Sequence, residues 1–597
     1  MVWRPTKFNH KYGLNEDDPA DLVICDNFDV HFRNHGGFFE KLLQGIDMGD
    51  DNLNEYGKMN PFYLKNCDDK YTKIPIFCLV NNVPVSRGLN YDRNIDQPLT
   101  NKIKSILAEK SNEINILVIT KNESGILPIL QILVKGFPSF GRYKNVRNDE
   151  VGNLLKIRYE CSDLDKNDLA RKVSFIADLD FAVKSISESN KLVDTPSNLL
   201  GVSDFAKYAI GELKNLKKEL NFKSKFDKKP EKGCIDYKVW SDKDITDKLE
   251  FRGLYNVGKG KSTDKAQLVF MAYRPISENG ECDDLIKPDS IYLDDEEKLP
   301  SPLNSNTSTS GSGSSTSRKK SNKWQNKFPT IFLAGKSIMF DAGGYSLKDK
   351  QSIIGMKFDM GGGAGILHTF INLVAKCNPR VNIVALLPIA YNGISATAYQ
   401  NDDIIEMHSG KFVEINNTDA EGRLCIADCV SYASGMLKAD YIFDLCTLTG
   451  AQGMTTGMHH AAMYANDENL ERIAVKVGKS SGDLVTPVVY APEVHKNQFK
   501  SSVADMTNSV GNRYDAQVSC AGYFIEAHLD EDWNGKFMHI DCACLNNFNY
   551  STWSRYPGFG VPFFGTMFRA MGWSAPESGL YDVDDEDISR MVSNLKI

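Results

Sequence analysis

Short apolar runs separated by polar stretches occupy the first part of the chain. Three of these runs, at residues 22–25, 76–80 and 116–119, have the length and composition of buried β-strands. Polar and helical stretches lie between them. This alternation predicts a smaller α/β domain over residues 1–160.

A different spacing follows between residues 161 and 193. Apolar residues recur there every three or four positions, as on one face of an α-helix: Leu169, Val173, Ile176, Leu179, Val183 and Ile186. This series predicts a long helix over 161–193 that joins two domains. Pro196 ends it, because proline disfavours helical geometry in the residue before it.

From residue 194 onward, buried-strand candidates alternate with helical patterns. The runs 331–333, 382–387 and 441–445 are apolar, and amphipathic helices are predicted between them. Regular alternation of strand and helix predicts a second α/β domain over 194–597. Its sheet is expected to be mostly parallel and covered by helices.

This second domain is interrupted at residues 276–328. The segment contains the acidic run 294–297 and the tract 304–317, which is almost entirely Ser, Thr, Asn and Gly. Such a composition cannot bury enough apolar surface to offset the entropy lost on ordering. We therefore predict a disordered insertion between two strands, since the cost of closing a loop grows only slowly with its length.

Composition and charge exclude several classes of protein. The 597 residues carry a formal net charge of −8, which gives no electrostatic basis for binding nucleic acid or an anionic membrane. Residues 1–21 are charged throughout, and no apolar run approaches the roughly 18 residues of a membrane span. We predict a cytoplasmic protein with no membrane partner. The thirteen cysteines contain no C-x-x-C pair, which favours reduced thiols.

Candidate chemistry is concentrated in the block 416–424, Asn-Asn-Thr-Asp-Ala-Glu-Gly-Arg-Leu. Asp419 and Glu421 lie at the start of a helix predicted from the apolar spacing that follows. Two carboxylates there require a cation, whereas Arg423 and the free backbone N–H groups of a helix start favour an anion. A capped, solvated helix start is the alternative interpretation of this block taken alone.

Two further segments change that interpretation. Lys336 and Asp341 follow the strand predicted at 331–333, and Asp359 leads into the next predicted helix. Strand ends and helix starts at one edge of an α/β sheet are where ligands bind. Together with Asp419 and Glu421, these aspartates carry a formal charge that two divalent cations would neutralise. Oxygen-rich ligation leaves Zn, Mn, Co and Mg as candidates.

With their spacing, these segments resemble the leucyl aminopeptidase family, the dinuclear metallo-exopeptidases of the M17 type. The resemblance covers roughly residues 194–568. The sequence around 447–453 and 519–522 is similar to that of the aminopeptidase-like branch of the family in animals. It implies a macro-like N-terminal domain, a catalytic second domain and a homohexamer. The implied activity is release of N-terminal amino acids from peptides, leucine-like ones preferred, by two-metal-activated water.

The resemblance also assigns the metal ligands. One metal would bind Lys336, Asp341, Asp359 and Glu421, and the other would bind Asp341, Asp419 and Glu421. Lysine can ligate only as a neutral amine. Burial beside the metals is therefore expected to depress the pKa of Lys336.

Further roles are implied for residues around these ligands. Lys348 is expected to stabilise the oxyanion that develops on the substrate. Arg423 would hold a bicarbonate acting as general base, together with the backbone of Ala420, Gly422 and Leu448. The pocket for the first side chain would be lined by Met356, Thr447 and Gly450.

Two other functions are compatible with parts of this pattern. One is a catalytically silent scaffold of the same fold, and the other is a two-metal phosphoesterase that does not depend on a free N-terminus. The presence of all five ligand positions, Lys348 and Arg423 favours the aminopeptidase over the scaffold. The motif with a ligating lysine favours it over the phosphoesterase.

Overall fold

The computed structural model describes most of the chain after residue 167 and shorter segments before it. The described ranges are 6–12, 22–25, 60–65, 71–78, 103, 105–106, 113–120, 123–135, 153–161, 168–227, 233–276, 328–512, 514–545, 558–576, 578–583 and 586–595. Apart from its two end residues, the predicted insertion at 276–328 lies outside the described residues.

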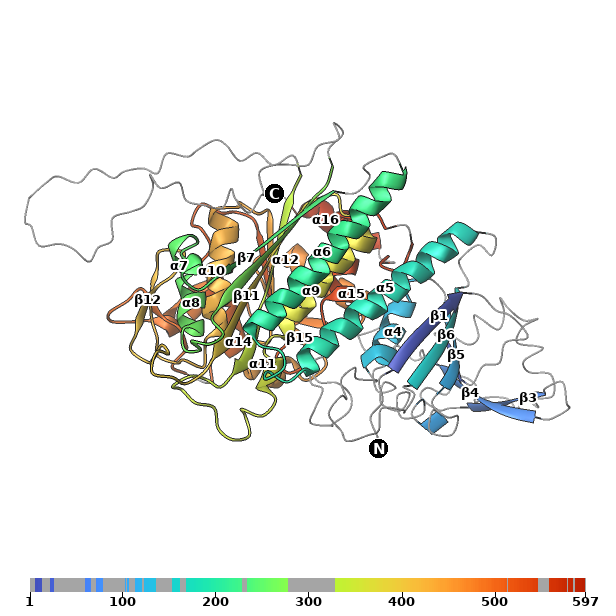
Figure 1. Ribbon diagram of the computed structural model, residues 1–597, viewed down its shortest axis with the longest axis horizontal. Coiled ribbons are helices and arrows are strands. Elements are labelled where there is room, and N and C mark those ends of the chain that lie inside the picture. Colours follow the sequence, from blue (N-terminus) through green and yellow to red (C-terminus); the bar gives the residue numbers. More distant parts are fainter. Residues whose placement is uncertain are drawn as a thin grey trace, which may run out of the picture.

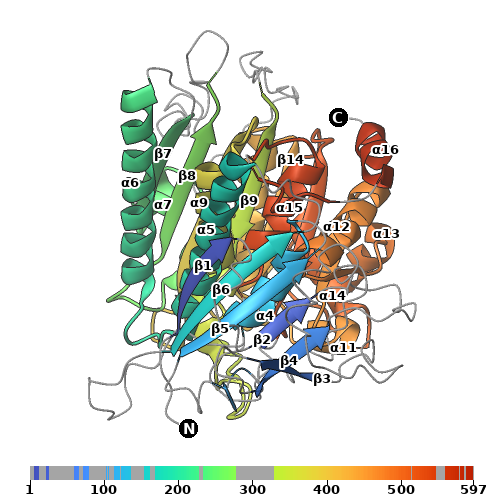
Figure 2. The ribbon, with the colours of Figure 1, turned by 90° about the vertical axis from the view of Figure 1, so that its right-hand side faces the viewer.

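The first part of the chain contributes a six-stranded sheet (Figure 2). Its strand order is β1-β6-β5-β2-β4-β3, and every pair is parallel except β3–β4. The elements are β1 (Thr6–Tyr12), β2 (Leu22–Cys25), β3 (Asn60–Lys65), β4 (Tyr71–Cys78), β5 (Glu113–Thr120), α4 (Ile126–Lys135) and β6 (Asn153–Cys161). An α/β arrangement is therefore present where the apolar runs predicted it.

A 26-residue helix, α5 (Leu169–Asp194), follows this sheet at the position predicted for the joining helix. It lies between the six-stranded sheet and the rest of the molecule (Figure 1). The two parts are tied together by hydrogen bonds as well as by apolar packing. One carboxylate oxygen of Glu123 accepts from Arg171 at 2.9 Å and from the Gly579 N–H at 2.6 Å.

The second sheet has nine strands in the order β16-β15-β18-β14-β9-β11-β8-β7, and β10 pairs with β11. Five of its eight strand pairs are parallel, so the predicted mostly parallel sheet is confirmed. The strands are β7 (Cys234–Ser241), β8 (Gln267–Arg274), β9 (Thr330–Gly335), β10 (Ser337–Asp341), β11 (Asn382–Asn392), β14 (Tyr441–Cys446), β15 (Ala461–Ala465), β16 (Val485–Pro487) and β18 (Lys536–Asp541).

Helices cover both faces of this sheet. Alternate residues of β9 show the two layers, because Ile331 and Leu333 pack in one apolar cluster while Phe332 and Ala334 pack in the other. The first cluster includes α5, α6 (Val202–Asp227), α9 (Gly361–Asn372), α12 (Glu468–Ser481) and α15 (Val561–Ala570). The second includes α8 (Arg252–Gly258), α10 (Gly422–Gly435) and α14 (Gln517–Glu526).

Shorter elements complete the described chain. A three-stranded sheet is formed by β12 (Ile404–Glu406), β13 (Phe412–Glu414) and β17 (Met506–Thr507). The other short elements are α7 (Lys243–Asp247), η5 (Met356–Phe358), η6 (Leu373–Cys377), α11 (Ala451–Thr456), α13 (Pro492–His495), η7 (Lys496–Phe499) and α16 (Glu586–Asn594).

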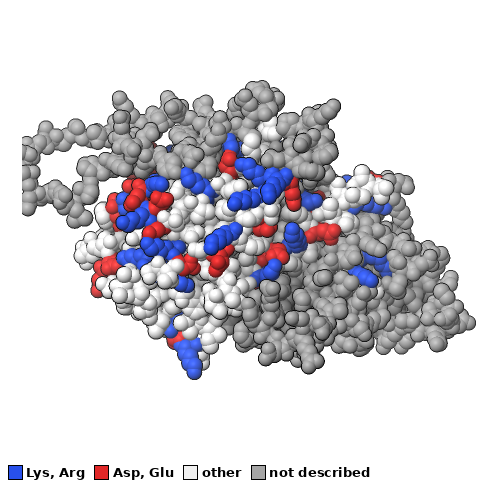
Figure 3. Space-filling view, in the orientation of Figure 1, with Lys and Arg blue, Asp and Glu red and all other residues white. Residues whose placement is uncertain are grey.

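Membrane-spanning segments, surface charge and cysteine pairing were the subjects of three sequence-based predictions. Within the described residues, no helix combines the length and the hydropathy that crossing a bilayer requires. Basic and acidic side chains lie interspersed on the face shown in Figure 3. Eight described cysteines have free thiols, but Cys234 is disulfide-bonded. The prediction that reduced thiols are favoured over a disulfide framework agrees with those eight cysteines and fails at Cys234.

Packing of α10 against α8 buries a carboxylate that makes stability depend on pH. Asp428 is fully buried and accepts hydrogen bonds from the backbone N–H groups of Leu254, at 3.0 Å, and His408, at 3.1 Å. Burial raises the pKa of Asp428 to about 7. Its folded pKa therefore exceeds its unfolded pKa, so its contribution to stability is present at low pH and is lost as the pH rises through 7.

We expect Asp428→Asn to remove this pH dependence, because the amide cannot ionise. The unfolding free energy of the variant minus that of the unchanged protein should rise by up to roughly 3 kcal/mol from pH 5 to pH 8, because only the unchanged protein loses stability over this range. Thermal unfolding at both pH values measures the difference. Asp244→Asn, at an exposed aspartate of α7, serves as the control. Parallel pH profiles for Asp428→Asn and the unchanged protein would contradict the prediction.

Candidate functional site

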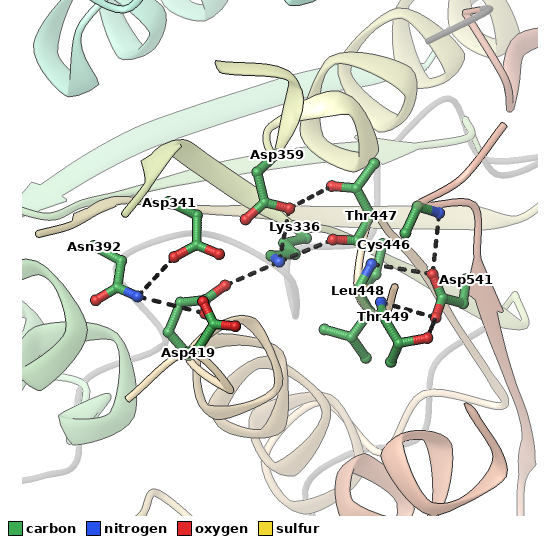
Figure 4. Close-up of polar contacts among 12 residues, drawn as sticks. Lys336, Asp341, Asp359, Asn392, Asp419, Cys446, Thr447, Leu448, Thr449 and Asp541 are labelled. Atoms are coloured by element: carbon green, nitrogen blue, oxygen red, sulfur yellow. Dashed lines mark hydrogen bonds and ion pairs between the residues drawn. The ribbon is translucent and has the colours of Figure 1, made fainter. Parts of the chain in front are cut away.

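Charged residues from four segments meet at the carboxyl edge of the nine-stranded sheet (Figure 4). Lys336 follows the last residue of β9, and Asp341 is the last residue of β10. Asp359 lies just before α9, and Glu421 immediately precedes α10. The structure thus brings together residues from all three segments that the sequence singled out.

Lys336 is the most enclosed cation of this group. Its ammonium lies 2.8 Å from Asp359 Oδ1 and 2.9 Å from Glu421 Oε1, and it donates to the Thr447 carbonyl at 2.9 Å. Burial lowers the pKa of Lys336, but Asp359, Glu421 and Asp341 outweigh it and hold the pKa well above its ordinary value. Three nearby carboxylates stabilise the ammonium in this arrangement. The expected depression of the Lys336 pKa concerns the metal-bound site and stays a prediction.

Three buried carboxylates form the acidic centre of the site. Asp341, Asp359 and Glu421 each offer an oxygen, and these oxygens lie within 4.8 Å of one another. Burial and the Glu421 carboxylate raise the pKa of Asp341 to about 7, and burial raises the pKa of Asp359 above its usual range. Oδ2 of Asp359 is buried and has no hydrogen-bond partner in the described part of the chain. A donor set of this kind fits a divalent cation.

Lys348 and Asp419 lie at the rim of this centre. The Lys348 ammonium is 2.8 Å from Asp341 Oδ2 and 2.5 Å from Asp419 Oδ1. The side chain of Asp419 is 33% exposed, whereas that of Asp341 is 4% exposed. Two glycines with positive φ, Gly343 (87°) and Gly344 (62°), make the turn that returns the chain to Lys348. Asp419 is therefore joined to the three central carboxylates through Lys348.

Arg423 occupies the first turn of α10, on the side of the site that was expected to hold an anion. Its guanidinium is buried and donates from Nη1 to the Asn508 carbonyl at 3.2 Å. Burial lowers the pKa of Arg423 to about 10. Its buried Nε–H has no hydrogen-bond partner among the described residues. An unpaired guanidinium donor in this position fits a small anion such as bicarbonate.

The residues expected to line the pocket for the first substrate side chain differ in how buried they are. Met356 is partly buried in η5, and Gly450 is exposed, with open space where a side chain would be. Thr447 is buried, and its hydroxyl donates to Asp359 Oδ1 at 2.9 Å, so it contacts the acidic centre. The Leu448 N–H donates to Asp541, and Ala420 and Gly422 are buried beside the centre.

Two residues at strand ends were missed from the sequence. Asn392 ends β11, and its Nδ2 donates to Asp341 Oδ1 at 2.8 Å and to the Thr418 carbonyl at 3.0 Å. Asp541 ends β18 and binds the backbone after β14. The apolar run at 382–387 signals β11, but the strand continues five residues further and only its last residue reaches the site.

Close backbone approach explains the run of three glycines before α9. A Cβ added to Gly362 would lie 2.0 Å from the Leu445 carbonyl oxygen, and one added to Gly363 would lie 2.0 Å from Ser337 Oγ. A helix with side chains at these positions could not pack against β14 and the β9–β10 connection. Gly362 and Gly363 therefore allow the start of α9 to lie close to the strand ends.

Comparison with known proteins places this geometry in a family. Residues 308–564 match the profile of the cytosol aminopeptidase family, catalytic domain. Over this segment the chain is similar to the catalytic domain of that family. The predicted M17 resemblance is thereby confirmed.

Relatives of this cytosol aminopeptidase domain include animal proteins. The chain is 44% identical over 267 residues to the human protein "Probable aminopeptidase NPEPL1", which covers 44% of this chain and 50% of the relative. It is 45% identical over 238 residues to leucine aminopeptidase 1 of Caenorhabditis elegans, covering 40% and 48%. The chain thus spans about half the length of the curated relatives it matches.

Solved structures of the family share the fold over a longer range. Leucyl aminopeptidase from Trypanosoma brucei in complex with bestatin matches with a TM-score of 0.67 and 26% identity, covering 92% of each chain. The enzyme from Leishmania major in complex with actinonin matches with a TM-score of 0.70 and 24% identity, covering 94% of each chain. The predicted fold class, an α/β catalytic domain preceded by a smaller α/β domain, is confirmed.

We expect Gly362→Ala to destabilise the protein by at least about 2 kcal/mol, because the added methyl group overlaps a backbone carbonyl that cannot move without shifting β14. Gly211→Ala in α6 is the matched control, since nothing lies within 4 Å of its added Cβ. That control should gain roughly 0.5–1 kcal/mol from its better helix propensity. Urea unfolding measures both. Equal stability of the two variants would contradict the close-packing argument.

Proposed function

We propose that this chain is a metalloaminopeptidase that releases N-terminal amino acids, leucine-like ones preferred, from peptides. The observation that carries the proposal is the buried group Asp341, Asp359 and Glu421, flanked by Lys336 and Lys348, within a cytosol aminopeptidase domain. Such a group is too acidic to be neutralised by its two lysines alone. It therefore supports a metal-dependent hydrolase.

Five residues would hold the metals. They are Lys336, Asp341, Asp359, Asp419 and Glu421, with two divalent ions of Zn, Mn, Co or Mg per chain. When bound, these ions supply Lewis-acid polarisation of the substrate carbonyl and activation of water. The unpaired Asp359 Oδ2 and the raised pKa of Asp341 support the fit, because both show carboxylates short of positive charge.

Two cationic side chains, Lys348 and Arg423, would act on the substrate oxyanion and on a bound bicarbonate. The Lys348 ammonium lies at the rim, with 14% of its side chain exposed, where a substrate carbonyl can approach it. Burial there strengthens its interaction with an oxyanion. Arg423, with its unpaired Nε–H, would orient a bicarbonate that accepts the proton of the attacking water.

Specificity for a free N-terminus follows from the charge of the site. A free α-amino group brings either a lone pair or a positive charge to the acidic centre, and an acylated amine brings neither. Met356, Thr447 and Gly450 would border the first side chain, and the flexible thioether of Met356 is compatible with leucine-like and methionine-like groups.

Several features of the proposal extend beyond the site. We also propose that residues 1–160 form the N-terminal domain, 161–193 the joining helix and 194–597 the catalytic domain, and that the chain assembles into a homohexamer. A cytoplasmic location is supported by the name "Probable cytosol aminopeptidase" of a Desulfotalea psychrophila relative, 37% identical over 221 residues. Light scattering tests the hexamer directly.

Release of leucine from Leu-amide and from N-acetyl-Leu-amide tests the function. After reconstitution with Mn or Zn, we expect cleavage of the free amine alone, and we expect a chelator to abolish it. Cleavage of the acetylated compound would contradict exopeptidase specificity. No cleavage with two metals bound per chain would favour the silent scaffold, and turnover of a phosphate ester instead would favour the phosphoesterase.

Lys348→Ala should lower kcat by roughly 100- to 1,000-fold, which is the effect of removing one oxyanion donor. Metal content should stay at two ions per chain, because Lys348 contacts the carboxylates and is not itself a ligand. Lys350→Ala is the matched control, since this exposed lysine lies two residues away on the same loop. Unchanged turnover in Lys348→Ala would refute its role. Metal loss would reassign it to maintaining the ligands.

A further inference from the structure

The turn that follows β14 connects the acidic centre to the proposed side-chain pocket. Thr447 accepts from the Lys336 ammonium through its carbonyl and donates to Asp359 through its hydroxyl, each at 2.9 Å. The next residues, Leu448 and Thr449, lead to the exposed Gly450. The position of this three-residue turn therefore decides the contacts of two proposed ligands and one border of the pocket.

A single buried carboxylate, that of Asp541, holds the turn in place (Figure 4). Asp541 is fully buried at the end of β18, in register with Cys446 of β14. Its Oδ1 accepts from the Leu448 N–H at 3.0 Å. Its Oδ2 accepts from the Thr449 N–H at 3.0 Å and from the Thr449 hydroxyl at 2.6 Å. The turn's own donors are thus satisfied by a side chain from the neighbouring strand.

The carboxylate of Asp541 also fixes its own strand end, because Oδ1 accepts from the Ala543 N–H at 3.1 Å. All four donors are uncharged, and no lysine or arginine among the described residues bonds to it. Two cationic groups act on it: His539, two residues earlier on the same face of β18, and the buried Arg423. His539 Nδ1 lies 2.5 Å from Oδ1 of Asp444, which is its register partner on β14.

Asp444, Cys446 and His539 also have the donor types of a metal site, with ligand atoms within 4.8 Å of one another. The 2.5 Å separation of Asp444 Oδ1 and His539 Nδ1 argues against that use. Two ligands of one tetrahedral zinc would lie about 3.3 Å apart at the usual bond lengths. This separation is that of a strong hydrogen bond, so the cluster is better explained as the charged support of Asp541.

We propose that Asp541, supported by His539 and Asp444, is a positioning residue that fixes the Thr447–Thr449 turn and through it the Lys336 and Asp359 contacts. The inference rests on the proposed function, since it names how the same metal site and pocket are held. Among the described residues, Asp541 hydrogen-bonds to Leu448, Thr449 and Ala543 and to none of the proposed metal ligands. Its effect on them passes through the turn.

Asp541→Asn tests the proposal in the full-length chain. The amide keeps the size of the side chain but turns a donor toward N–H groups that the carboxylate accepts from, so the turn must shift. We expect Zn and Mn to bind at least about 10-fold more weakly in chelator competition, the loss typical when a group that orients a ligand is changed. We also expect the ratio of kcat/KM for Leu-amide over Ala-amide to fall.

Asp428→Asn is the matched control, because Asp428 is likewise a buried aspartate that accepts backbone N–H groups, but it lies in the packing of α10 against α8. This control should alter thermal stability and leave metal affinity and the Leu/Ala ratio unchanged. If Asp541→Asn behaves in the same way, its role is only structural and the proposal is overturned. Thr449→Val removes the hydroxyl that donates to Asp541 at 2.6 Å and accepts from the Gln452 N–H at 3.2 Å, and it should shift both readouts in the same direction by less. It provides the test if Asp541→Asn does not fold.

The metal readout separates this proposal from the proposed function. A chain that binds metal but cleaves no peptide would defeat the aminopeptidase, and chelator competition would still decide the role of Asp541. A chain that cleaves Leu-amide, with unchanged metal affinity and selectivity in both variants, would defeat the positioning role alone. A chain that binds no divalent cation would defeat both.

Discussion

Carboxylates gathered at the edge of a buried sheet need positive charge near them, and this requirement organises the second half of the molecule. Asp341, Asp359, Asp419 and Glu421 contribute a formal −4, while Lys336 and Lys348 contribute +2, which leaves −2. Moving such a charge out of water is costly unless cations compensate it. The two lysines offset half of this charge, so further positive charge is needed. With Lys336 as a neutral ligand, as proposed for the metal-bound site, the four carboxylates and Lys348 would leave −3 for the two divalent ions to compensate.

The backbone around this centre is shaped to bring the charges together. Gly362 and Gly363 let the start of α9 approach the strand ends more closely than any residue with a side chain would allow. Gly343 and Gly344 turn the chain back so that Asp341 and Lys348 lie side by side. Substitutions at these glycines would thus act on the site by displacing backbone, without removing a charged group.

Buried charged residues also lie within the sheet next to the acidic centre. Asp444, His539 and Asp541 lie on two adjacent strands that are otherwise strongly apolar, and all three are fully buried. Burial of the His539 imidazole lowers its pKa, but Asp444 and Asp541 outweigh it and raise the pKa above the ordinary value. Alternating charges of this kind compensate one another in a low-dielectric core, where isolated ones would be costly.

The sequence by itself determined the alternation of strands and helices, the joining helix and the segments that supply the charged residues. These features depend on local apolar spacing and on residues at strand ends and helix starts, which a single chain displays directly. Tertiary structure decided the rest. Asn392 reaches Asp341 across 51 positions and Asp541 reaches Leu448 across 93, so neither contact leaves a local pattern. The enclosure of Lys336 likewise depends on carboxylates that only folding brings within 3 Å of it, because they come from segments far apart along the chain.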